Sequence, residues 1–495
     1  MLPNVTITKQ DGNTGVVKPA TVGVIAIIAA AAAGPSNQPG TFTRQADAVS
    51  THQLGPLCEY GAYWMQNAKK PAILIRPTTS VAATYSSITF TGTGTSVVTA
   101  GATAPADDYN VTVTVVSGGT IGVAGITFKY TLDGGENTSA LTALGTANTY
   151  LFNAPVVGLS TGVTVDFGAG TLVAGDTFTF TTTRPKMNNS DLVTALEALR
   201  VSRLPWDAVL IDADWSSTLG STLDSWLAGL EGVGKFKYGY MNTRHKNLPV
   251  PSAESEATFA TAMGTLTGSS ASIRYNLGTD AGDLPSPITG LVHPRPVSLG
   301  AITRAGQFAV GVDPAYVANG PIPGFQICDD NSNPKWHDEA LYPGLDDLRL
   351  TTFRSFNDEQ GTYLDNARVF SPNGSDYVYD QHARCMNVAC TIAYSLLTKE
   401  LSRGVQKQAP DPTTGKIYIL ETEAAAIEAL VNPNLEQQLK GQVVAVALEL
   451  SRTDDLSSNA GAQVNAEVQV EALAYIKGFV VSAKFVKTIT VTAGG

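Results

Sequence analysis

Residues 78–183 constrain the fold of this chain more than any other stretch. Thr, Gly, Val and Ala dominate the segment, and Lys129 is its only Lys or Arg. Apolar residues alternate with polar ones in runs such as 111–115, 163–167 and 177–181, and glycine-rich turns separate the runs. Short alternating strands at this spacing are typical of a β-sandwich or a small barrel. We therefore predict an inserted all-β sandwich or barrel domain at 78–183.

The sequence on both sides of this segment predicts an α/β core. Before it, the apolar runs 20–30 and Ala72–Ile75 indicate buried strands on either side of a helix at 54–68. After it the same pattern of apolar strands and helices returns, and Ser190 would cap the first helix. The elements expected there are two helices and two strands, at 190–201, 208–211, 218–230 and 236–241. Because both flanks belong to one core, the two ends of the insertion should lie close together.

A long helix is the main feature of the second half. A helix at 376–403 would turn Cys385, Ala389, Ile392 and Leu396 towards the interior. A loop rich in Pro, Gln and Asp follows. We then expect a short strand and a helix, at 417–420 and 421–431.

Alternation returns near the C-terminus. Val464, Ala466, Val468 and Val470 alternate with polar residues, which indicates a strand with one buried face. A second run at 479–491 also has high strand propensity and no proline. A terminal strand must find an edge to pair with. It either closes a sheet of its own chain or is donated to another copy, and the strand itself leaves both possibilities open.

Composition limits the classes of function. The chain has 495 residues, which suggests about three domains. Lys and Arg total 32 against 43 Asp and Glu, and the net charge of −11 argues against a protein that coats nucleic acid. Only 15% of residues are charged, which suits a surface used in contacts with other chains. The apolar run 22–33 is too short for a bilayer and lacks signal-peptide flanks, so we expect a cytoplasmic product without a membrane anchor.

No arrangement of residues predicts an enzyme, a cofactor or a metal site. The cysteines have no metal-binding spacing and are expected to act as small hydrophobic residues: Cys58, Cys328, Cys385 and Cys390. The histidines lack metal-ligand spacing too: His52, His245, His293, His337 and His382. Asp212 with Asp214, and Asp346 with Asp347, are the tempting acidic pairs, and we predict structural roles for them. The alternative is a glycan-active enzyme, or an adhesin, with a β-sandwich carbohydrate-binding insert. Such an enzyme needs a carboxylate pair in a cleft.

The order of several motifs resembles the contractile tail sheath proteins of bacteriophages and related contractile injection systems. The N-terminal motifs are an apolar run, a Gly-Pro-Ser-Asn-Gln-Pro loop, an aromatic residue and a strand ending in Ile-Arg, at 24–30, 34–39, Phe42 and 75–76. The later motifs are Asp-Asp-Leu-Arg and an Asn-Ala-Arg-Val-Phe strand before the long helix, at 346–349 and 366–370. The resemblance covers residues 1–77 and 184 to the end. The long helix begins with a less basic sequence than in many sheaths, and the insert aligns with nothing in the family.

The resemblance implies a division into four parts. An N-terminal arm at 1–20 carries a donated strand. A discontinuous α/β sheath domain occupies 21–77 and 184–345, and the β-rich insert at 78–183 lies on the outside. A C-terminal polymerisation domain occupies 346–495.

The resemblance also implies function and partners. The chain would be a structural subunit, not an enzyme, of a helical homopolymer built from stacked, hexameric rings. The polymer would surround a tail tube protein and contact baseplate and tail terminator proteins, without a cofactor and without direct contact to nucleic acid. It would form part of the virion tail after assembly in the host bacterial cytoplasm. Its contraction would drive the tube through the target envelope and so allow ejection of the viral genome.

Two sets of residues follow from the resemblance. The subunit–subunit strand exchange would use the apolar residues of both terminal strands: Val5, Ile7, Phe485, Val486, Ile489 and Val491. The linkers that flex during contraction would contain glycines, which tolerate the backbone angles that a hinge visits: Gly12, Gly15 and Gly478.

Overall fold

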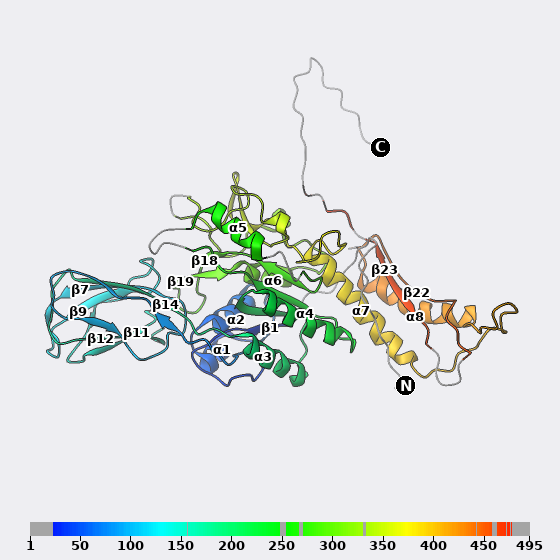
Figure 1. Cartoon of the computed structure of the whole chain (residues 1–495), viewed down its shortest axis with the longest axis horizontal. Helices are drawn as coiled ribbons and strands as arrows, with labels where there is room; N and C mark the ends of the chain where they lie inside the picture. Colours follow the sequence, from blue (N-terminus) through cyan, green and yellow to red (C-terminus); the bar gives the residue numbers. More distant parts are fainter. Residues whose placement is uncertain are drawn as a thin grey trace, which may run out of the picture.

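The structure is a computed structural model with a mixed α/β fold and several sheets. It describes residues 23–155, 157–247, 254–266, 271–329, 333–441, 443–457, 463–471, 473–475 and 477. Along the longest axis, a β-rich region lies at one end, the α/β core lies in the middle, and a helical unit with a small sheet lies at the other end (Figure 1). In the described residues, no helix is both long and apolar enough to cross a membrane.

A six-stranded sheet forms the middle of the core, in the order β17-β16-β15-β1-β3-β2. Its strands are β1 Ile25–Ile28, β2 Gly40–Phe42, β3 Ala72–Ile75, β15 Ala208–Asp214, β16 Tyr238–Asn242 and β17 Tyr275–Gly278. All neighbours are parallel except β2, which runs antiparallel to β3. Every residue of β1 and β3 is buried, because helices cover both faces. The strands predicted around 20–30, 72–75, 208–211 and 236–241 are confirmed.

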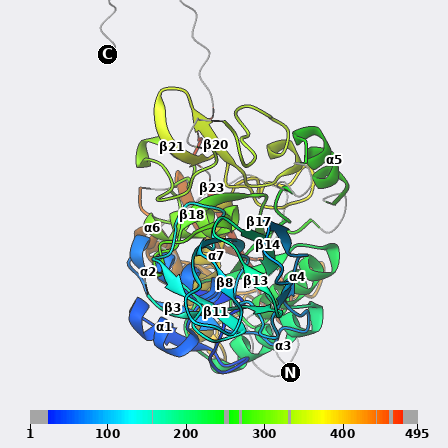
Figure 2. The same ribbon diagram turned by 90° about the vertical axis from the view of Figure 1, so that its left-hand side faces the viewer.

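Helices cover the two faces of this sheet in separate groups. One face carries α1 Gln45–His52, α2 Pro56–Asn67 and α6 Val297–Gln307, and the other carries α3 Asn189–Ser202, α4 Ser217–Glu231 and α5 Glu256–Leu266. Figure 2 shows α1 and α2 on one side of the core and α3 and α4 on the other. The prediction that Ser190 caps α3 is wrong. Asn188 accepts the backbone N–H of Asp191 instead, and the Asp191 carboxylate accepts the N–H of Asn188, which is a complete capping box.

Residues 84–183 form a β-rich region of open sheets. One sheet has the order β10-β9-β7-β14-β4, with β5 also paired to β14, and a second has the order β11-β12-β6. The strands are β4 Thr84–Tyr85, β5 Thr89–Thr91, β6 Val98–Ala100, β7 Asn110–Ser117, β8 Gly119–Thr120, β9 Thr127–Thr131, β10 Thr142–Ala143, β11 Thr149–Asn153, β12 Ser160–Phe167, β13 Thr171–Leu172 and β14 Thr177–Thr183. Phe128, Phe152 and Phe178 belong to one hydrophobic core between the sheets. No sheet among the described residues closes into a barrel.

The two ends of the β-rich region lie side by side, as expected. Val81 and Lys186 form an antiparallel bridge, and β4 pairs with the end of β14. The core of the region also includes Leu54 and Leu291 from the α/β part. At this contact Gly55 has φ +117°, and a Cβ atom there would lie 3.1 Å from the carbonyl oxygen of Ala106. Only glycine meets both conditions without strain.

The helical unit at the other end contains α7, α8 and a two-stranded antiparallel sheet. Its elements are α7 Asp380–Glu400, α8 Glu421–Gln438, β22 Ala445–Leu450 and β23 Ala466–Glu471. The helix α7 starts later than the predicted residue 376, because Tyr379 is held extended in a bridge with Arg368. The same bridge replaces the strand expected at 366–370. The helix α8 runs past the predicted end at 431 and contains Pro433.

Other predictions for the second half are met in part. In the described part of the chain, the strand predicted at 417–420 reduces to a bridge between Ile419 and Lys407. The strand predicted around 464–470 is β23, in which Val470 is buried and Val468 half-buried, whereas Ala466 is exposed. The remaining elements are two hairpins and two short 3-10 helices: β18 Ala281–Pro285, β19 Val292–Pro296, β20 Phe353–Phe356, β21 Glu359–Leu364, η1 Val317–Asn319 and η2 Asp346–Leu348.

A buried histidine ties α5 to the segment that precedes η2. His337 Nδ1 lies 2.8 Å from Glu256 Oε2, and its Nε2 lies 2.8 Å from Glu339 Oε2. Burial lowers the pKa of His337, but its hydrogen bonds to the two carboxylates outweigh burial and raise the pKa to about 9. Lys246 pairs with Glu256 on the same side, and Asp280 accepts the backbone N–H groups of Lys246 and His337 at 2.7 Å. Burial raises the pKa of Asp280 to about 6.

The charge on His337 should make stability depend on pH. The pKa of His337 is about 9 in the folded chain and about 6.5 in the unfolded chain. The stabilisation of the folded state by protonated His337 is therefore complete below pH 6.5 and is lost as the pH rises to 9. The difference in melting temperature between wild type and His337→Gln should shrink between those limits. His382→Gln is the control, because burial lowers the pKa of His382 and its difference should change only at acidic pH, with the opposite sign. A constant difference for His337→Gln from pH 6 to 9.5 would contradict the assignment.

Candidate functional site

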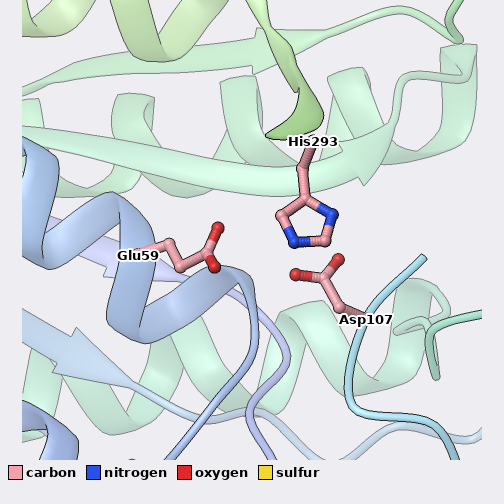
Figure 3. A group of neighbouring side chains, drawn as sticks. All are labelled: Glu59, Asp107 and His293. Carbon is pink, nitrogen blue, oxygen red and sulfur yellow. The ribbon is translucent and has the colours of Figure 1, made fainter. Parts of the chain in front are cut away.

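Three buried side chains with metal-ligating atoms meet where the β-rich region joins the core. Glu59 lies on α2, Asp107 lies on the loop before β7, and His293 lies on β19 (Figure 3). One ligand atom from each lies within 4.8 Å of the others. Carboxylates and imidazole together are a common ligand set for divalent metals, so the chemistry of this cluster has to be decided from its surroundings.

Arg295 supplies the positive charge of this cluster. It lies two residues after His293 on β19, and its side chain is 1% exposed. Its Nε donates to Glu59 Oε2 at 3.0 Å, and its Nη1 donates to Asp107 Oδ1 at 3.1 Å. Burial raises the pKa of Asp107, but the charges of Arg295 and His293 outweigh burial and hold the pKa well below its usual range. A divalent cation among these carboxylates would lie next to a guanidinium that already neutralises them. We therefore interpret the cluster as an ion-pair junction, and not as a metal centre.

A second ion-pair network continues the junction towards the central sheet. Arg184, directly after β14, pairs with Asp108 and with Asp212 at the end of β15, the latter at 2.8 Å. The Tyr60 hydroxyl donates to Asp212 Oδ1 at 3.0 Å. The Arg295 guanidinium lies 5.7 Å from the centroid of the Tyr60 ring, so Tyr60 connects the two networks. Together these contacts link α2, β15 and β19 to the loop before β7 and to the residue after β14.

The junction accounts for the first pair of acidic residues that the sequence singled out. Asp212 has Arg184 and Tyr60 as partners, and Asp214 pairs with Lys186 at 2.8 Å. Burial alone would raise the pKa of Asp214, but Lys186 holds it below its ordinary value. These carboxylates are therefore bound in ion pairs that hold the β-rich region, as the predicted structural role requires.

The second acidic pair lies in the 3-10 helix η2 and contacts the bridge that precedes α7 through Arg368. Asp346 pairs with Arg368, whose Nε lies 2.6 Å from Asp346 Oδ1. The Arg368 guanidinium also lies 5.1 Å from the ring centroid of Tyr379, the residue before α7. Asp347 is the next residue of the same 3-10 helix η2. The contacts of Asp346 fix the entry into α7, which is a structural role.

The cysteines are thiols, and none of the four forms a disulfide. Cys58, Cys385 and Cys390 are buried and Cys328 is half-buried. Burial raises the pKa of Cys58 to about 12, which keeps its thiol protonated at physiological pH. Their use as small hydrophobic residues agrees with the prediction.

The residues predicted to exchange strands or to act as hinges lie outside the described residues. They are Val5, Ile7, Phe485, Val486, Ile489 and Val491, and the glycines Gly12, Gly15 and Gly478. The sequence did not predict the junction, because Glu59, Asp107 and Arg295 come from three distant segments. The Asp107-Asp108 pair could have indicated the junction. These two adjacent carboxylates lie in a segment whose only Lys or Arg is Lys129, so their partners had to come from elsewhere in the chain.

Comparison with known proteins gives structural similarity only. No protein-family model and no curated protein matches the chain. The chain is similar to a sheath tail protein from Listeria innocua, with 11% identity, a TM-score of 0.43, and coverage of 92% of this chain and 96% of that chain. A sheath tail protein from Desulfitobacterium hafniense gives 11% identity, a TM-score of 0.45, and coverage of 95% and 100%. The sheath of an extracellular contractile injection system in its contracted state gives 15% identity, a TM-score of 0.39, and coverage of 64% and 77%.

Removing the junction cation should destabilise the chain strongly. Arg295→Met leaves Glu59 and Asp107 buried without their counter-charge, which should cost about 3–5 kcal/mol of unfolding free energy. The triple variant Glu59→Gln, Asp107→Asn, Arg295→Met should recover most of the loss, because no unpaired charge remains. Arg200→Met, which removes an exposed pair with Glu197, is the control and should leave the denaturant midpoint unchanged. A midpoint for Arg295→Met equal to that of wild type would contradict the role of the junction.

Proposed function

We propose that this chain is the structural subunit of a helical contractile tail sheath that surrounds a tail tube and contracts to drive it through a target cell envelope. The observation that carries the proposal is the small sheet on α7 and α8. A two-stranded sheet has an outer edge on each strand, and such edges are sites where a strand of another chain can add. The sequence after it, at 479–491, has the composition of a strand.

Exchange of terminal strands would join the subunits. The donated residues would be Val5 and Ile7 from one end of a chain, and Phe485, Val486, Ile489 and Val491 from the other end. Each donated strand supplies main-chain hydrogen bonds, and its apolar side chains fix the register. A head-to-tail contact that does not close a ring generates a helical polymer.

The proposed subunit has four parts. An arm at 1–20 precedes a sheath domain at 21–77 and 184–345. The β-sandwich at 78–183 is an insertion on the outside, and the polymerisation domain occupies 346–495. Support for the insertion comes from its paired ends and from the ion pairs that cross its border.

The proposed partners are those of a tail. The chain forms stacked hexameric rings with its own copies, encloses a tail tube protein, and meets a baseplate and a tail terminator. It acts without a cofactor or direct contact to nucleic acid, in the virion tail after assembly in the host cytoplasm. The glycan-active alternative required a free carboxylate pair. We set it aside because Asp212, Asp214 and Asp346 each pair with a cation.

The last described residues give the proposed C-terminal hinge a fixed base. The Tyr475 hydroxyl donates to the carbonyl oxygen of Gly311 at 2.7 Å. Lys477 pairs with Asp313, and its Nζ lies 4.5 Å from the centroid of the Tyr379 ring. The chain is thus attached to the core up to the residue before Gly478, and a hinge at this glycine would turn about that attachment.

Deletion of residues 484–495 tests the role of the terminal strand. The truncated chain should keep the circular dichroism spectrum and melting temperature of wild type, because the residues that form the four hydrophobic cores all remain. It should no longer form tubes in electron micrographs. A variant in which the same residues are replaced by a Gly/Ser segment of equal length is the matched control for chain length and should also fail. Tubes of normal length from either variant would contradict the exchange.

Stiffening the N-terminal linker tests the hinge. Gly12→Pro combined with Gly15→Pro restricts the backbone angles at both positions. Tubes or tails should still assemble, but the fraction that contracts after a mild denaturant trigger should fall, as counted in micrographs. Gly12→Ala with Gly15→Ala is the milder control. Equal contracted fractions and equal rates for the proline variant and wild type would remove the hinge.

A further inference from the structure

We propose that a basic edge of the central sheet in one copy of this chain binds an acidic face of the β22–β23 sheet in a second copy. The basic edge consists of three exposed cations: Lys69, Arg203 and Lys235. The acidic face consists of three exposed carboxylates: Glu449, Glu467 and Glu471. The proposal rests on the proposed function, because it names a contact between the folded parts of two subunits.

The basic edge follows from the direction of the strands in the central sheet. The strands β3, β1, β15 and β16 are parallel, so their first residues meet at one edge. The connections that lead into β3, β15 and β16 at this edge contain five cations and one carboxylate: Lys69, Lys70, Arg203, Lys235 and Lys237, and Asp207. The chain as a whole has a net charge of −11, so this edge differs in sign from the molecule that carries it.

The one carboxylate at this edge has partners already. Asp207 Oδ2 accepts the backbone N–H of Gly23 at 2.7 Å, and its Oδ1 lies 3.8 Å from Lys237 Nζ. In the described part of the chain, no carboxylate pairs with any of the three exposed cations of the basic edge. A row of exposed cations of this kind attracts an acidic surface.

The acidic face is the exposed side of the β22–β23 hairpin. Glu449 lies directly opposite Glu467, and Ala445 lies opposite Glu471. Like charges that face each other across an antiparallel pair destabilise it. Among the residues that the structure describes, no cation pairs with these three carboxylates. A basic surface laid on this face would replace the repulsion by attraction.

The acidic face points away from the basic edge of its own chain. The other face of the hairpin packs on α7 and α8 through residues such as Val446 and Leu448. The helix α7 also contacts the basic edge, because a Cβ atom at Gly234, the residue before Lys235, would lie 2.2 Å from the Tyr394 ring. In Figure 1, α7 accordingly lies between α4 of the core and the strands β22 and β23. The complementary surface must therefore come from another copy.

The two surfaces have similar dimensions. Neighbouring strands lie about 4.8 Å apart, so the ends of β3 and β16, three strand spacings apart, are separated by about 14 Å. Glu467 and Glu471 are four residues apart on β23, which is also about 14 Å. Val233 beside the basic edge is 57% exposed, and Val444 beside the acidic face is 59% exposed. Their contact would add apolar burial to the ion pairs.

The contact continues from copy to copy. The edge and the face are different surfaces, so two copies that use one edge and one face leave the other edge and the other face open. Such a head-to-tail contact does not produce a two-fold dimer, and it builds a chain of subunits. Complementary charges also speed the encounter of the copies and fix their register.

Reversal of the charges on each surface tests the contact. The face variant carries Glu449→Lys, Glu467→Lys and Glu471→Lys, and the edge variant carries Lys69→Glu, Arg203→Glu and Lys235→Glu. Each variant alone brings like charges together and should raise the concentration needed for assembly by about a hundredfold, as measured by sedimentation velocity and electron microscopy. An equimolar mixture should assemble at the wild-type concentration, because each surface of one variant is complementary to the other variant.

Two controls separate assembly from folding and from total charge. All substituted residues are exposed, so the melting temperatures of both variants should stay within a few degrees of wild type. Lys129→Glu reverses an exposed charge on β9, far from both surfaces, and should assemble like wild type. A chain that carries all six substitutions should assemble by itself, because both of its surfaces have changed sign together.

The other results have distinct meanings. Tubes from either variant alone at the wild-type concentration would overturn the contact and leave the proposed function intact. Folded variants that fail alone and also fail as a mixture would overturn the pairing of this edge with this face. Short oligomers that show the mixing rescue but never form tubes would support the contact and contradict the sheath. Wild type that stays monomeric at every concentration would overturn both.

Discussion

The strand β1 pairs with β3 on one side and with β15 on the other, and the rest of the structure depends on this constraint. Ile25 lies opposite Ala72 of β3 and also opposite Ala208 of β15, in parallel register. The chain between β3 and β15 must therefore leave the sheet and return to it beside its own starting point. The β-rich region is the part of the chain that makes this excursion, and its ends meet in the bridge between Val81 and Lys186.

The two chain connections to the core fix where the β-rich region begins and ends, but they do not fix its orientation. The ion-pair junction fixes the orientation. Arg295 and Arg184 each bind one carboxylate of the core and one beside the β-rich sheets. Buried ion pairs contribute little net stability, because desolvation offsets most of their attraction. Their geometry is directional, however, and it holds the two parts of the molecule in one arrangement.

Local patterns in the sequence predicted elements with local causes. The run Ala72–Ile75 is apolar throughout and becomes a strand buried on both faces, and the alternation at 111–115 becomes part of β7. Errors arose where a distant contact decides the outcome. The start of α7 depends on the bridge of Arg368 with Tyr379, and the length of α8 depends on packing around Val431 and Leu435 that outweighs Pro433. Local patterns could not predict the candidate site, because each ion pair joins side chains that are remote in the sequence.

The Asn432 side chain imitates the backbone of a neighbouring strand, with one donor and one acceptor at Leu448. The backbone groups of Leu448 are thus satisfied within the chain and are not left open to another extended peptide. Unpaired strand edges promote non-specific association, so an amide on α8 protects this part of the sheet against it.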